Sequence, residues 1–106
     1  MNEEFEQLLR SKAEPIVVQI TEPFLEADAQ TETVAEEIRK LRADAYIVRI
    51  DLSLHREWAR KHRVFGAPCL LVFSGGQLRI RIRGHVNRTR LRSALARAGL
   101  LRSPTG

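Results

Sequence analysis

The chain has 106 residues, of which 43% are hydrophobic and 29% charged, with a net charge of +5. This length suits one hydrophobic core, so we expect a single domain over residues 1–100 and a flexible C-terminal tail over residues 101–106. There is no run of about 18 apolar residues, and the acidic start is unlike a secretory signal, so we expect a cytoplasmic protein. The single cysteine, Cys69, excludes an intramolecular disulfide and a cysteine-rich metal site.

The N-terminal half predicts two helix and strand pairs in succession. Apolar residues at helical spacing favour a helix over Glu3–Lys12, which Pro15 prevents from continuing. The β-branched run Ile16–Ile20 predicts a buried central strand. A second helix is expected from about Thr31 to Leu41, and a second strand over Ala45–Asp51.

The next segment predicts a short helix. Ser53 is a residue type that caps helices, and we expect the helix after it to present Leu54 and Trp58, together with Ala59, to the core.

The C-terminal half predicts a β-hairpin and a closing helix. The segments Cys69–Phe73 and Gln77–Arg83 are separated by a glycine turn, which is typical of two antiparallel strands. Strict alternation in the second strand predicts that Ile80 and Ile82 face the core and that the intervening arginines face solvent on an edge strand. A helix is expected from about Asn87 to Ala98.

This order of elements, together with several motifs, resembles the thioredoxin family. The shared features are Asp51 at a strand end, the pair Trp58–Ala59, the stretch 63–73 around Pro68, the hairpin glycines, and Gly84 before the last helix. The resemblance implies an α/β thioredoxin-like fold: a four-stranded mixed sheet of strand order 2-1-3-4, flanked by helices and preceded by an extra helix. It also implies a cis peptide bond before Pro68, and a backbone at Ala67 that pairs with an extended substrate segment.

The redox motif of the resembled family is missing. Its two cysteines would fall near Phe24 and Ala27, where this sequence has no sulfur, so disulfide exchange by the family's route is excluded. Two interpretations of Cys69 remain open. It is either a buried small hydrophobic residue or a reactive thiol that forms mixed disulfides or is glutathionylated, with His85 as a neighbour.

Charge is divided sharply along the sequence. All 13 acidic residues lie within the first 57 positions, so residues 1–57 carry a net charge of −6 and residues 58–106 carry +11. This division suggests an acidic partner, a nucleic acid or head-to-tail self-association, and it is also consistent with an ordinary solvated face. The expected basic patch comprises Arg79, Arg81, Arg83, Arg88, Arg90 and Arg92.

These observations favour a redox-inactive, thioredoxin-like protein that binds a polypeptide as a chaperone-like or accessory module, and not an enzyme. The expected peptide-binding residues are Phe24, Ala67, Pro68, Cys69, Gly84 and His85. One alternative is a monothiol redox or glutathione-linked protein that uses Cys69. Another is a basic module that binds an acidic protein or RNA, although the basic residues lack interleaved aromatics. We expect no cofactor, and no metal site because the histidines are scattered.

Overall fold

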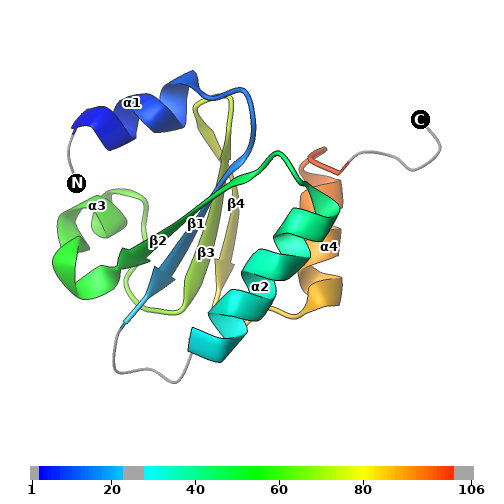
Figure 1. The fold of residues 1–106 in the computed structure, drawn as a ribbon. Helices are drawn as coiled ribbons and strands as arrows, with labels where there is room; N and C mark the ends of the chain where they lie inside the picture. Colours follow the sequence, from blue (N-terminus) through cyan, green and yellow to red (C-terminus); the bar gives the residue numbers. More distant parts are fainter. Residues whose placement is uncertain (1–2, 23–27, 102–106) are drawn as a thin grey trace.

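The structure, a computed structural model, describes residues 3–22 and 28–101, with side chains from residue 34 onward in the second range. Figure 1 shows a helix before each of the first three strands, a hairpin of the third and fourth strands, and a closing helix. The α2 helix begins at Asp28, earlier than the predicted start near Thr31. None of the helices in the described ranges is both long and apolar enough to cross a membrane. The elements are α1 Glu3–Ser11, β1 Ile16–Thr21, α2 Asp28–Leu41, β2 Tyr46–Asp51, the 3₁₀-helix η1 Leu52–Leu54, α3 Arg56–Lys61, β3 Cys69–Ser74, β4 Gln77–Arg83 and α4 Arg88–Arg97.

The four strands form one mixed sheet in the order β2-β1-β3-β4, which confirms the expected topology. Strand β1 pairs with β2 in parallel and with β3 antiparallel, so that Val18 lies opposite both Val48 and Leu71. The predicted central position of β1 is therefore correct, and its near-complete burial explains why it lacks polar alternation.

Helices cover both faces of the sheet, with α1 and α3 on one face and α2 and α4 on the other (Figure 1). Successive side chains of a strand point to opposite faces, so Val18 packs in the α1/α3 layer whereas Val17 packs in the α2/α4 layer. In the same way Leu71 belongs to the first layer, and Leu70 and Val72 belong to the second.

The segment after β2 corrects the prediction for Ser53 and Leu54. Asp51 provides the cap, because its carboxylate accepts hydrogen bonds from the amide and the hydroxyl of Ser53, at 2.9 and 2.6 Å. Since η1 ends before His55, Leu54 does not share a helical face with Trp58, and Leu54 is 74% exposed. The predicted burial of Trp58 and Ala59 is confirmed.

The hairpin forms as predicted, but its second strand does not alternate strictly. Ile80 and Ile82 pack in the α2/α4 layer, as expected. A β-bulge shifts the register so that Val72 lies opposite Ile80 and Phe73 opposite Leu78, with Arg79 skipped. Leu78 therefore packs in the α1/α3 layer, because one extra residue inverts the side-chain alternation.

Helix α4 closes the fold as predicted. The side chain of Asn87 accepts a hydrogen bond from the amide of Arg90 at 2.8 Å, which caps the helix. Leu91 and Leu95 are buried against the sheet.

Candidate functional site

The loop between α3 and β3 carries the residues that the resemblance assigns to peptide binding. The peptide bond between Ala67 and Pro68 is cis, as expected. Both residues are half-buried, and Gly66 before them is exposed. Within residues 3–22 and 28–101, neither the amide nor the carbonyl of Ala67 takes part in a hydrogen bond. This stretch of backbone can therefore still accept a pairing partner.

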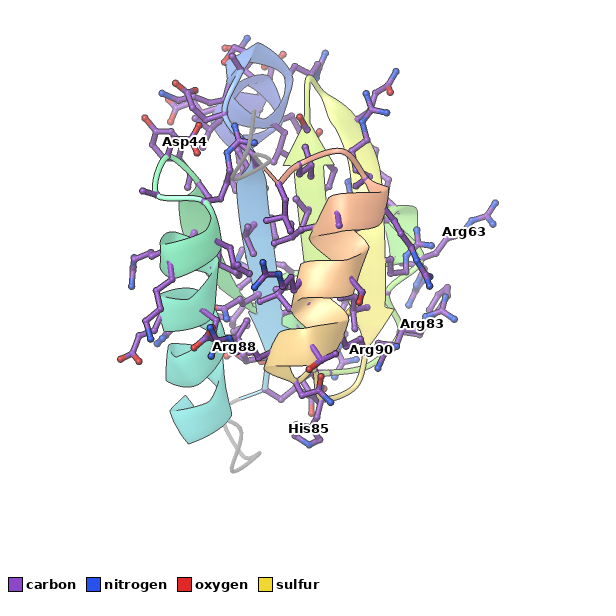
Figure 2. The ribbon with its side chains drawn as sticks, turned by 90° about the vertical axis from the view of Figure 1, so that its right-hand side faces the viewer. Asp44, Arg63, Arg83, His85, Arg88 and Arg90 are labelled. Atoms are coloured by element: carbon purple, nitrogen blue, oxygen red, sulfur yellow. The ribbon has the colours of Figure 1, made fainter. Side chains whose placement is uncertain are left out.

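The loop between β4 and α4 lies beside this proline. The amide of Gly84 donates a hydrogen bond to the carbonyl of Pro68 at 2.9 Å. Gly84 has a φ of +80°, a conformation that favours glycine. His85 follows as an exposed residue (Figure 2).

The structure thus brings together five of the six residues expected to bind peptide. The sixth, Phe24, lies outside the described residues, as does the neighbouring position Ala27. The five are Ala67, Pro68, Cys69, Gly84 and His85.

A surface pocket of about 380 Å³ lies beside the cis peptide bond. Phe65, which sequence reasoning did not place in the site, lines it and is 72% exposed. Aromatic residues in a small domain are usually well buried, so sequence patterns give no reason to expect an exposed Phe65. The one sequence feature that indicates a surface loop here is the glycine that follows it, Gly66. Arg83, expected only in the basic patch, also lines this pocket. The full lining is Val64, Phe65, Gly66, Ala67, Pro68, Cys69, Arg83 and Gly84.

A second hollow of about 430 Å³, which His85 lines, lies between α2 and α4. Val34 and Leu91 contribute apolar surface to it. At its rim the guanidinium of Arg88 contacts the carboxylate of Glu37, with Nε 3.0 Å from Oε2. His85 therefore belongs to this second hollow and does not line the pocket beside Phe65.

Cys69 is buried, with 4% of its surface exposed. Burial raises the pKa of its thiol, while the nearby Arg81 and Arg83 lower that pKa to a smaller extent. A reactive cysteine needs exposure to solvent and a thiol pKa low enough for the thiolate to form. The geometry therefore favours the interpretation of Cys69 as a small hydrophobic residue at the start of β3.

The six arginines of the expected basic patch are distributed over different surfaces. In Figure 2, Arg88 lies on the α2 side of α4, Arg90 lies toward β4, and Arg83 extends beyond the edge of the sheet. Arg79, Arg81 and Arg90 line one groove, which Arg97 also lines. Arg92 is exposed on α4 and does not line that groove.

His62 belongs to an aromatic cluster under α1. Its ring centroid lies 4.5 Å from that of Trp58 and 5.3 Å from that of Phe73. Burial is the main cause of its lowered pKa; the Glu6 carboxylate opposes this shift, and Lys61 and Arg81 reinforce it. Among the residues described, no group of three or more histidine, cysteine or acidic side chains is placed to hold a metal ion.

Comparison with solved structures identifies the fold. Thioredoxin from Fasciola hepatica is 21% identical with a TM-score of 0.74, and the match covers 90% of this chain and 91% of that one. Oxidised thioredoxin from Plasmodium falciparum is 15% identical with a TM-score of 0.73, covering 92% and 91%. Oxidised mitochondrial thioredoxin 3 from Saccharomyces cerevisiae is 18% identical with a TM-score of 0.73, covering 89% and 87%. No family model matches the sequence, and a search of curated proteins gives no match. The chain therefore has a thioredoxin-like fold with a single cysteine and no Cys-x-x-Cys pair.

Proposed function

We propose that the protein is a redox-inactive module that binds an extended polypeptide segment, in a chaperone-like or accessory role. Its binding surface is the loop pair Gly66–Pro68 and Gly84–His85, with Phe65 beside it. The observation that carries this proposal is the exposed Phe65 next to a pocket and to the backbone of Ala67, which has no hydrogen-bond partner among the described residues.

The exposure of Phe65 supports a binding role. A phenylalanine that is 72% exposed leaves a large apolar surface in water, and aromatic residues dominate the energetics of peptide and protein interfaces. The adjoining pocket of about 380 Å³ is large enough for an apolar side chain of a bound segment.

The backbone of Ala67 supports recognition of an extended chain. A peptide lying beside it can exchange main-chain hydrogen bonds in the manner of strand addition, which gives affinity without demanding a particular sequence. The hydrogen bond from Gly84 to Pro68 holds the two loops together, so the surface is preformed and little ordering is needed on binding.

The absence of a second thiol supports the redox-inactive part of the proposal. Dithiol exchange needs an attacking and a resolving cysteine, and this sequence has only Cys69, which is buried. We expect no reduction of insulin disulfides by the protein. Turnover comparable to that of a thioredoxin would contradict the proposal.

The binding site can be tested with a permanently unfolded probe, reduced and carboxymethylated α-lactalbumin. We expect amide chemical-shift changes concentrated at Phe65–Cys69 and Gly84–His85 when the ¹⁵N-labelled protein is titrated with it. Replacement Phe65→Ser should weaken binding by roughly 10- to 30-fold, the effect of losing about 1.4 to 2 kcal/mol at an aromatic anchor.

Leu54 provides a matched control, because it is 74% exposed but does not line the pocket beside Phe65. Leu54→Ser should leave the affinity for the unfolded probe nearly unchanged. Equal loss in the two variants would mean that the probe adheres to any exposed apolar side chain, and the proposed site would be wrong.

A further inference from the structure

A groove of about 530 Å³ lies between the outer edge of β4 and helix α4, apart from the Ala67–Pro68 surface. Arg79 and Arg81 contribute from the strand, and Arg90 and Arg97 contribute from the helix. Between these arginines the lining is mostly aliphatic, with Ile80, Ile82, Ala94 and Ala98. The groove therefore has positive charge on both sides and an apolar floor.

These four arginines have no acidic partner within the described residues, whereas other arginines of the protein do. Arg88 contacts Glu37, and Arg42 contacts Asp44 at 2.6 Å. The guanidinium of Arg81 donates to the carbonyl of His62 at 2.9 Å on the α1/α3 side of the sheet, so the positive charge of the groove comes from Arg79, Arg90 and Arg97. Like charges gathered around one groove repel each other, and an acidic ligand would relieve that repulsion.

The sequence cannot supply this counter-charge from nearby positions. No acidic residue occurs after Glu57, so β4 and α4 carry only positive charge. A side-chain carboxylate that reaches the groove must come from the N-terminal half of the chain or from another molecule.

The shape of the groove suits a polypeptide better than a single-stranded nucleic acid. None of the described residues that line it is aromatic, so they offer no stacking platform for bases. Strand β4 is the last strand of the described sheet, and its outer edge offers backbone groups to an extended segment. Arg90 and Arg97 are two helical turns apart, about 10 Å along the axis, which is about three residues of an extended chain.

We propose that this groove binds an extended acidic polypeptide segment of about six residues. Carboxylates at alternating positions of such a segment would meet Arg79 of β4 on one side and Arg90 and Arg97 of α4 on the other. The bulge at Arg79 limits regular backbone pairing to the part of β4 from Ile80 onward, so charge complementarity contributes most of the selectivity.

A fluorescently labelled, end-capped hexaglutamate peptide is the probe, and the hexaglutamine peptide with the same label is its uncharged counterpart. Fluorescence anisotropy should show binding of hexaglutamate only, with an affinity that falls steeply between about 50 and 200 mM salt. The double replacement Arg79→Gln and Arg97→Gln removes one charge from each side of the groove. We expect it to weaken hexaglutamate binding roughly tenfold, since each exposed charge pair contributes modestly.

The matched control is the double replacement Arg56→Gln and Arg92→Gln, which removes the same charge from exposed positions outside the groove. It should change the affinity by less than about twofold. Circular dichroism melting verifies that both double variants are folded. Equal weakening in the two would indicate attraction by net charge alone and overturn the proposal.

Two further measurements distinguish other occupants. Tighter binding of a hexathymidine oligonucleotide than of hexaglutamate would assign the groove to nucleic acid and overturn the proposal. Self-association in sedimentation experiments that the groove variant abolishes would assign the groove to a second copy of this chain and also overturn it. Phe65→Ser should leave hexaglutamate binding unchanged, so this inference and the proposed function fail independently.

Discussion

Replacement of Gly84 by alanine tests how the backbone of the site is held. Gly84 has a φ of +80°, and a Cβ built on it meets no atom of the described residues within 4 Å. A steric clash with the described residues therefore cannot account for a loss of stability in Gly84→Ala. The cost is the backbone conformation itself, about 1 to 2 kcal/mol for an L-residue at positive φ.

Gly66→Ala is the matched control in the same surface. A Cβ on Gly66 also meets no atom within 4 Å in the part of the chain that the structure describes, but its φ is not in the positive range. Both replacements reduce the entropy of the unfolded chain equally, which stabilises each variant by about 0.4 to 1 kcal/mol. The difference between the free energies of unfolding of the two variants therefore isolates the cost of the native backbone conformation at Gly84.

Urea denaturation followed by circular dichroism measures both variants. We expect Gly66→Ala to equal or exceed the wild type in its free energy of unfolding, and Gly84→Ala to lie about 1 to 2 kcal/mol below Gly66→Ala. The corresponding difference in melting temperature is roughly 4 to 8 °C per kcal/mol for a domain near this size. If the two variants unfold at the same urea concentration, Gly84 is not held at positive φ and the argument fails.

Three further predictions concern buried groups. Cys69 should react with an aromatic disulfide reagent at least about 100-fold more slowly in the native protein than in urea, because it is buried and its thiol pKa is raised; a native rate like that of free cysteine would favour the monothiol alternative. The pKa of His62 is lowered from 6.5, so the native state binds its proton less readily than the unfolded state. The His62 contribution to stability is therefore fully present above about pH 6.5 and is lost as the pH falls below that value toward the native pKa. Urea denaturation between about pH 7.5 and 5 should show a shallower pH dependence for His62→Phe, and identical slopes would contradict this assignment. The indole Nε1 of Trp58 donates a hydrogen bond to the carboxylate of Glu6 at 2.8 Å. Trp58→Phe should therefore lower the free energy of unfolding by about 1 to 3 kcal/mol. Glu6→Gln keeps an accepting oxygen and should lower it by less than about 1 kcal/mol. A larger loss in Glu6→Gln would contradict this ranking.

Much of the fold could be predicted because its signals are local. The β-branched run of β1 and the glycine turn of the hairpin each reflect the conformation of a few consecutive residues. The resemblance around Pro68 added the strand order, which local periodicity alone does not define.

The errors arose where one residue changes the geometry of its neighbours. A bulge at Arg79 places Leu78 in the opposite layer from Ile80, although both positions have the same parity in the sequence. Likewise, η1 ends before His55, so Leu54 lies on a separate turn from Trp58 and faces solvent. In both places the pattern predicted an uninterrupted element that the structure interrupts.

The sequence by itself determined that the chain has no dithiol and that its acidic and basic residues lie in different halves, since both are properties of composition. Only the tertiary structure decided that Gly84 lies against Pro68, that Phe65 is exposed, and that Arg88 pairs with Glu37 while Arg90 faces a groove. The physical reason is distance along the chain. Periodicity relates residues a few positions apart, whereas these contacts depend on how separate strands and helices pack together.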